Sequence, residues 1–146
     1  MAKINIEGNY LVDSKKERVD SFLGNMIALS KCMKGLEEIK VLNENFLSGK
    51  IKVSEGLLRG IFNLEANLKQ NLNNIIIQLK MSGTLARAQA LINIETKEIS
   101  ENKTMIEYKA EVDVGGLGAI LSKKQIYEIS DKILKDIFDC FNTYYQ

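Results

Sequence analysis

The stretch that decides the fold is residues 106–141, IEYKAEVDVGGLGAILSKKQIYEISDKILKDIFDCF. From residue 106 to residue 114 apolar and polar residues alternate, which predicts a half-buried β-strand. After the glycines at 115–118 the apolar spacing becomes helical, and Ser122 with Gln125 has the pattern of a capping box. The sequence therefore predicts that a strand leads into a long C-terminal helix, from about Lys123 to Tyr144.

The predicted helix has a wide apolar face, because two apolar stripes lie next to each other along it. At about 1.5 Å per residue it is long enough to lie across a whole sheet. We expect Ile133 at the centre of the buried face. The two stripes consist of Ile126, Ile129, Ile133, Ile137, Cys140 and Phe141, and of Tyr127, Leu134, Phe138 and Tyr145.

Upstream, the same alternation predicts further antiparallel strands, separated by polar turns. After the first strand, Ser14 and Glu17 form another capping-box pattern, and Gly24-Asn25 divides the following segment into two short helices. Each strand has one apolar face, and only the C-terminal helix is large enough to cover the sheet that they form. The predicted strands cover residues 3–12, 36–42, 47–53, 62–69, 75–81, 86–94 and 106–114.

The predicted fold class is therefore α+β. A curved seven-stranded antiparallel sheet wraps around a long C-terminal helix, and two short helices follow the first strand. We expect residues 1–146 to form a single domain, since this length suits one domain with its own core.

The composition excludes several classes of function. A net charge of +1 argues against nucleic-acid binding by bulk electrostatics. The chain contains no His, which rules out a Ser-His-Asp triad, a Cys-His pair and an imidazole metal ligand. We identify no catalytic residue, no metal-ligand spacing and no cofactor motif. No apolar run approaches the roughly 18 residues of a transmembrane segment.

The two cysteines, Cys32 and Cys140, are far apart in the sequence and lie in no metal-ligand spacing. The N-terminal residues lack the apolar segment of a signal peptide. We therefore expect two reduced thiols in a cytoplasmic protein, each acting as a small hydrophobic residue of the core.

The inward-facing residues of the predicted strands are unusually small, which indicates space between the sheet and the helix. Either larger side chains fill this space or an apolar cavity remains, and such cavities are typical small-molecule sites. Tyr108 is an inward polar group that either hydrogen-bonds the backbone or orients a ligand. The expected cavity-lining, ligand-binding residues are Leu47, Ile51, Phe62, Leu64, Ile77, Leu79, Ala88, Ala90, Tyr108, Ala110, Leu134, Phe138 and Phe141.

The predicted order of elements resembles the helix-grip fold of the START-related and Bet v 1-like proteins (the SRPBCC superfamily). Within it, CMKGL at 32–36 resembles a Cys-Leu-Pro-Gly segment, and KIKV at 50–53 with GIF at 60–62 resembles a Lys-Val-Lys-Val…Gly-Thr-Phe hairpin. EVDVGGL at 111–117 resembles the segment that precedes the last helix. Together these are similar to the CoxG family of carbon monoxide dehydrogenase proteins, although Lys34 stands where the family usually has Pro and the basic tail of some members is absent.

The resemblance implies a small accessory protein and not the molybdenum enzyme itself. It leaves two functions open. The first is a non-catalytic carrier for an apolar, lipid- or quinone-like molecule, and the resemblance implies a carbon monoxide dehydrogenase-type redox enzyme as the partner it would assist. The second is a protein-interaction or assembly factor with a filled core and no ligand. An enzyme of the cyclase type fits less well, because no inward acid–base group is evident. Peripheral membrane contact stays open.

Overall fold

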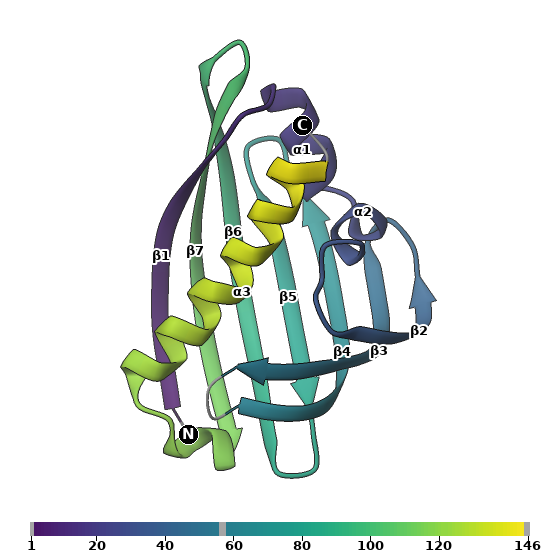
Figure 1. The fold of residues 1–146 in the computed structure, drawn as a ribbon, viewed down its shortest axis with the longest axis vertical. Coiled ribbons are helices and arrows are strands. Elements are labelled where there is room, and N and C mark those ends of the chain that lie inside the picture. Colours follow the sequence, from purple (N-terminus) through teal and green to yellow (C-terminus); the bar gives the residue numbers. More distant parts are fainter. Residues whose placement is uncertain (1, 56–57, 145–146) are drawn as a thin grey trace.

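All seven predicted strands are present in one antiparallel sheet of the computed structural model, which describes residues 2–55 and 58–144 (Figure 1). The order across the sheet is β1-β7-β6-β5-β4-β3-β2, so β2 to β7 follow the order of the sequence, while β1 pairs with β7 at the edge opposite β2. The strands are β1 (Ala2–Val12), β2 (Leu36–Leu42), β3 (Phe46–Glu55), β4 (Leu58–Gln70), β5 (Ile75–Ser82), β6 (Ala86–Ser100) and β7 (Lys103–Gly116).

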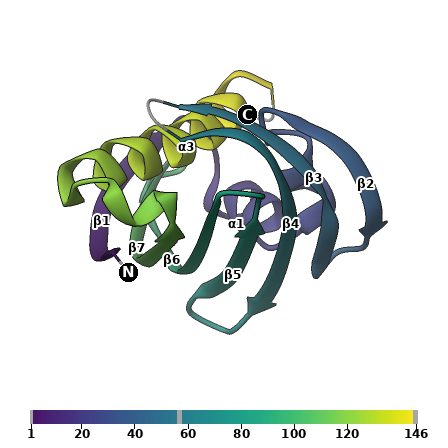
Figure 2. The same cartoon turned by 90° about the horizontal axis from the view of Figure 1, so that it is seen from below.

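The sheet curves strongly, and the helices occupy its concave side (Figure 2). The long helix α3 (Lys123–Tyr144) crosses this side diagonally after a short 3-10 turn, η1 (Leu117–Ile120). Two short helices, α1 (Lys16–Leu23) and α2 (Met26–Ser30), lie at the end of the concave side where α3 ends (Figure 1). The predicted helix-grip architecture is therefore confirmed.

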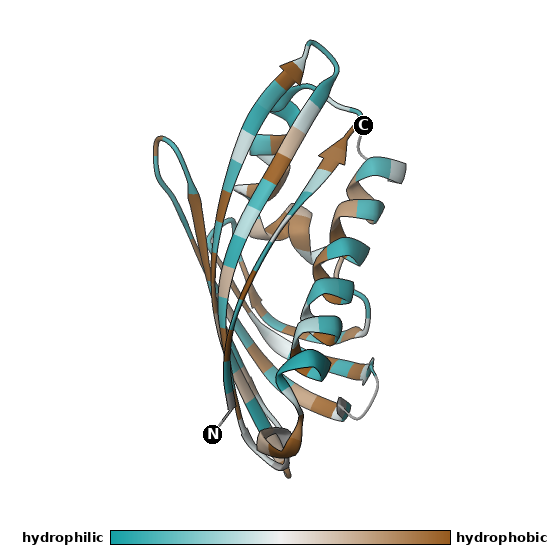
Figure 3. Ribbon diagram, turned by 90° about the vertical axis from the view of Figure 1, so that its left-hand side faces the viewer, coloured by the Kyte–Doolittle hydropathy of each residue, from teal (hydrophilic) through white to brown (hydrophobic). Residues whose placement is uncertain are grey.

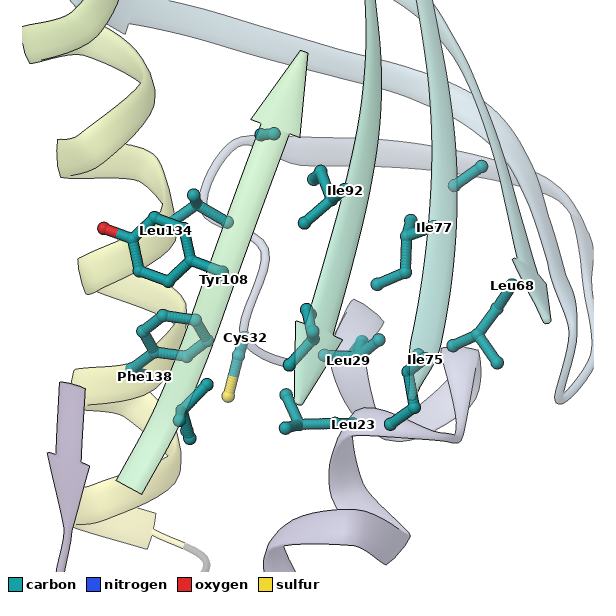
Figure 4. Close-up of a cluster of buried hydrophobic side chains, with 14 of the residues drawn as sticks. Leu23, Leu29, Cys32, Leu68, Ile75, Ile77, Ile92, Tyr108, Leu134 and Phe138 are labelled. Carbon is teal, nitrogen blue, oxygen red and sulfur yellow. The ribbon is translucent and has the colours of Figure 1, made fainter. Parts of the chain in front are cut away.

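The core forms because the buried positions of the strands are apolar while the exposed positions are mostly polar. Hydrophobic and hydrophilic residues accordingly alternate along the strands (Figure 3). On β4, for example, every second residue from Phe62 to Leu68 is buried and the residues between them are exposed. Figure 4 shows how side chains of α1 and α2, such as Leu23 and Leu29, meet Ile75 and Leu68 of the sheet. The predicted alternation thus holds, although β6 and β7 run further than predicted, to Ser100 and from Lys103.

One of the two predicted capping boxes forms. The backbone N–H of Ser122 donates to Gln125 Oε1 at 2.8 Å, and the N–H of Gln125 donates to Ser122 Oγ at 3.1 Å. The box predicted at Ser14 is wrong, because α1 begins one residue later, with Lys15 as an N-cap whose side chain makes no capping bond. Ser14 is buried instead, and its carbonyl accepts a hydrogen bond of 2.8 Å from Thr104 Oγ1.

The buried face of α3 is centred differently from the prediction. Leu134, Phe138 and Phe141 are buried, while Ile133 is 37% exposed. Phe138 lies between two tyrosine rings of the sheet, with ring centroids 5.5 Å from Tyr10 and 5.8 Å from Tyr108. The prediction that Ile133 forms the centre of the buried stripe is therefore wrong. The buried residues of α3 come from both stripes, and Ile133 lies over the incompletely covered cavity. Tyr145 lies outside the described residues.

The expectation of two reduced thiols is also wrong. Cys32, just after α2, and Cys140, on α3, form a disulfide across a sequence separation of 108 residues. A bond that closes so long a loop stabilises a fold chiefly by restricting the unfolded chain, typically by about 2–4 kcal/mol. It joins the last two turns of α3 to the α1–α2 unit.

The residues that the structure describes include no helix long and apolar enough to cross a membrane. They also include no group of three or more Cys, Asp or Glu side chains placed to hold a metal ion.

We expect Phe138→Ala to lower the free energy of unfolding by about 3–5 kcal/mol, because it leaves a cavity between the helix and two tyrosine rings. Ile133→Ala, on the same helix, should cost less than about 1 kcal/mol, since this side chain is already partly in water. Urea unfolding followed by circular dichroism measures both values. Equal losses would show that the buried face has been assigned to the wrong stripe.

Candidate ligand cavity

A cavity of about 120 Å³ lies between the first half of α3 and the middle of the sheet. Strands β5, β6 and β7 form its floor, and α3 with Leu121, just after η1, forms its roof. It is the candidate functional site, because its walls are almost wholly apolar and it lies on the concave side of the sheet. The lining residues are Leu79, Met81, Ala88, Gln89, Ala90, Ile92, Ala110, Val112, Val114, Leu121, Ile126, Ile129, Ser130, Ile133 and Leu134.

The structure brings together five of the residues expected to line a cavity. These are Leu79, Ala88, Ala90, Ala110 and Leu134. The space exists because three of them are alanines on the neighbouring strands β6 and β7, so little side-chain volume rises from the sheet under the helix. Ala90 and Val112 are directly opposite in the β6–β7 register, as are Ile92 and Ala110, so small residues alternate with larger ones across the floor.

The other expected residues lie outside this lining. Leu47, Leu64, Ile77, Phe138 and Phe141 are packed in the main core and are not among the lining residues. Ile51 is half-buried on β3, and Phe62 is buried against the turn between β5 and β6, where a Cβ on Gly83 would come within 2.9 Å of its ring. Tyr108 is 2% exposed. It lies nearer the start of β7 than the cavity-lining residue Ala110 does.

Sequence reasoning misses most of the roof and part of the floor. The apolar spacing places Ile126, Ile129 and Ile133 in one stripe and turns Met81 and Ile92 inward, so the orientation of these residues is predictable. The missing information is the point at which α3 crosses the strands. That crossing depends on the curvature of the sheet, which the alternation of residues does not specify.

The cavity is incompletely covered at the end of the sheet nearest η1. Leu79, Met81, Ala88 and Ala90 face α3, yet each is only half-buried. At the same end, Leu85 in the turn between β5 and β6 is 66% exposed. An apolar molecule could therefore approach the cavity past apolar side chains of this turn.

The lining offers little chemistry beyond apolar contact. Gln89 and Ser130 are the polar residues of the lining, and none of the described residues that line the cavity carries an ionisable side chain. Such a site can remove an apolar group from water and orient one polar atom. Proton transfer would have to come from groups elsewhere, because acid–base catalysis needs an ionisable group within hydrogen-bond reach.

Two tyrosines of the sheet hold α3 from Asp131 onwards. Tyr108 Oη donates a hydrogen bond of 2.8 Å to Asp131 Oδ1, and Tyr10 Oη donates to Asp139 Oδ1, two helical turns further on. Gly8 makes room for this arrangement, because a Cβ at this position would collide with the Tyr108 hydroxyl. The partner of Tyr108 is thus a carboxylate and not the backbone group expected for a buried tyrosine.

The pKa values of this pair reflect their contact. Burial, together with the hydrogen bond and charge of Asp131, holds the pKa of Tyr108 well above its usual range, so this hydroxyl stays protonated. Burial alone would raise the pKa of Asp131. The hydrogen bonds from Lys135 and Tyr108 and the charge of Lys135 outweigh that effect, so the pKa of Asp131 lies below its ordinary value.

Further contacts also hold the second half of α3 in place. The N–H of Asp13 donates to Asn142 Oδ1 at 3.0 Å. Along the helix, Cys140 of the disulfide lies between Asp131 and Asn142. Lys132 Nζ lies 3.5 Å from a carboxylate oxygen of Glu55 on β3. In the described part of the chain, the polar contacts from α3 to the sheet and loops begin at Asp131. The part of the helix before Asp131, which covers one end of the cavity, is held mainly by apolar contacts.

These features define a helix-grip protein with an apolar cavity, and comparison with known proteins identifies the family. The model of the family described as CoxG, the G subunit of carbon monoxide dehydrogenase, matches residues 8–146. The chain therefore belongs to the CoxG family. A search of curated proteins found no match.

Solved structures support the same fold. A conserved protein from Geobacillus kaustophilus superposes with a TM-score of 0.86 at 18% identity, covering 96% of this chain and 93% of that one. A START superfamily protein from Mycobacterium smegmatis gives 0.69 at 11% identity, covering 97% and 96%. Ara h 8.0201 gives 0.67 at 8% identity, covering 99% and 98%. At these identities the similarity shows a shared START-like fold.

We expect Tyr108→Phe to raise the pKa of Asp131 towards its ordinary value of about 3.9, because the carboxylate loses a hydrogen bond that favours its charged form. A depressed folded pKa stabilises the protein above the unfolded pKa, and this contribution is lost as pH falls through the folded pKa. The stability difference between the wild type and Tyr108→Phe should therefore be larger at pH 7 than at pH 2. NMR titration of the Asp131 carboxyl and urea unfolding at both pH values test this.

Tyr144→Phe serves as the control, because Tyr144 is 78% exposed at the end of the same helix. It should leave the pKa of Asp131 unchanged. An unshifted pKa in Tyr108→Phe would contradict the assignment of this hydrogen bond.

Proposed function

We propose that this protein is a non-catalytic accessory protein that holds the apolar part of a lipid- or quinone-like molecule between the sheet and α3. The observation that carries the proposal is the cavity, whose lining is apolar apart from Gln89 and Ser130. Burial of apolar ligand surface would drive binding, at roughly 25 cal/mol per Å² before the cost of association. No cofactor is part of this proposal.

The size of the cavity restricts what it holds in this conformation. Dedicated ligand pockets enclose about 300–1,000 Å³, whereas an engineered apolar cavity of about 150 Å³ binds benzene. At about 120 Å³, the cavity suits a small ring or a short length of chain. A larger ligand requires displacement of the first half of α3, which is the half held mainly by apolar contacts.

The proposed partner is a redox enzyme of the carbon monoxide dehydrogenase type, and the family name supports it. The alternative is an interaction or assembly factor whose small cavity stays empty. The net charge of +1 favours neither nucleic acid nor a strongly anionic surface, although peripheral membrane contact remains compatible with the exposed apolar residues near the cavity.

A cytoplasmic location is part of the proposal, and the disulfide restricts it. Disulfides persist mainly in oxidising compartments, and within cells they occur chiefly in hyperthermophiles or as catalytic and redox-sensing bonds. A cytoplasmic location therefore requires either the cell interior of a hyperthermophile or a catalytic or redox-sensing role for the Cys32–Cys140 disulfide.

Ala90→Phe tests the carrier function, because the new ring would occupy the cavity without entering the close-packed core. We expect benzene to bind the wild type with chemical-shift changes confined to the lining, and a decyl-ubiquinone analogue to bind with changes that extend along the part of α3 before Asp131. The variant should bind both at least about tenfold more weakly. Leu91→Phe, on the outward face of the same strand, should leave binding unchanged. Ala66→Phe, at a fully buried position, should instead destabilise by about 1–3 kcal/mol through overpacking.

Failure of every apolar probe to bind the folded wild type would contradict the carrier function and favour the alternative. Extraction and mass spectrometry of the purified protein provide a second readout. A lipid or quinone that co-purifies with the wild type and is depleted in Ala90→Phe supports the carrier.

A further inference from the structure

A second, larger recess lies at the opposite end of α3 from the cavity. This end groove has a volume of about 660 Å³ and runs between α1–α2 and the last turn of α3. Its lining is mixed, with aromatic and small apolar residues beside exposed polar and charged ones. The lining residues are Lys15, Glu17, Arg18, Ser21, Phe22, Asn25, Ala28, Phe141 and Tyr144.

The rim of the end groove carries unpaired positive charge. Lys15 and Arg18 are exposed, and neither forms an ion pair with another described residue. The nearby cation Lys16 differs, because its Nζ lies 2.7 Å from Asp20 Oδ2. Among the described lining residues Glu17 is the single carboxylate, so the start of α1 presents two cations and one anion to the groove.

The walls of the end groove are held rigidly. The rings of Phe22 on α1 and Phe141 on α3 pack with centroids 4.8 Å apart at its base. One residue before Phe141, the disulfide joins α3 to the segment after α2. A preformed groove loses little conformational entropy on binding, so weakly attractive contacts produce measurable affinity.

We propose that the end groove docks an acidic segment of a partner protein that also carries apolar side chains. Arg and Tyr are enriched at the energetic centres of protein interfaces, and the rim presents Arg18 together with Tyr144, which is 78% exposed. The Ser21 hydroxyl and the side-chain NH₂ of Asn25, whose Oδ1 already caps α2, suit a peptide, because its backbone supplies donors and acceptors that an acyl chain lacks. The excess positive charge selects a segment with Asp or Glu. Docking at this end leaves the cavity at the other end of α3 free.

The test uses a fluorescein-labelled acidic peptide in which Asp alternates with Leu and Phe, and a matched peptide with Lys in place of Asp. We expect the acidic peptide to bind the disulfide-intact protein, with amide shift changes at Ala28 and at the end of α3, and the basic peptide to bind at least tenfold more weakly. Lys15→Glu with Arg18→Glu should weaken binding of the acidic peptide at least tenfold. Lys15→Gln with Arg18→Gln gives a milder variant if the charge reversals impair folding.

The matched control is Lys109→Glu with Arg87→Glu, which makes the same change of net charge at exposed positions on the sheet. It should weaken binding less than twofold. Equal losses in the two double variants, shift changes that do not map to the groove, or no binding of the acidic peptide would each overturn the proposal. So would tight binding of anionic phospholipid vesicles through Lys15 and Arg18, since it would identify a membrane as the occupant.

Discussion

The packing of Phe138 between Tyr10 and Tyr108 is the contact on which the rest of the structure depends. A single curved sheet has one apolar face, and the described chain contains one long helix to cover it. Phe138 is 1% exposed, and its two tyrosine neighbours each hydrogen-bond a carboxylate on the same helix. The apolar contact and the polar contacts therefore fix both the rotation of α3 and its position along β1 and β7.

This concentration of contacts gives α3 two unlike halves. From Asp131 onwards the helix is joined to the sheet, the loops and the segment after α2 by hydrogen bonds, an ion pair and a disulfide. Before Asp131 it makes mainly apolar contacts with the sheet, and the cavity beneath it extends as far as Ile133 and Leu134. Local stability follows the density of such contacts, so the first half of the helix is the part able to move without unfolding the protein. The division places a ligand cavity at one end of α3 and a rigid groove at the other.

The sequence was sufficient for the fold because each strand alternates cleanly and the C-terminal helix has caps and a broad apolar face. It was insufficient wherever the outcome depended on the path of the chain in space. Ser14 and Ser122 head the same local pattern, yet only Ser122 caps a helix, because Ser14 is held against Thr104 of β7. Ile133 and Leu134 are neighbours on two equally apolar stripes, and only the curvature of the sheet decides which one is buried.

The cavity and the disulfide illustrate the same limit. Alternation identified Ala88, Ala90 and Ala110 as small inward residues, but the crossing point of α3 determines that these alanines adjoin empty space while Ala66 is close-packed. The approach of Cys32 to Cys140 across 108 residues has no local signal, since it results from the return of α3 over the α1–α2 unit.

Amide hydrogen exchange along α3 tests the division of the helix most directly. The amides of residues 131–142 should exchange at least about tenfold more slowly than those of residues 126–130, and an apolar ligand should slow exchange selectively in residues 126–130. Uniform protection along α3, or faster exchange in its second half, would contradict the account.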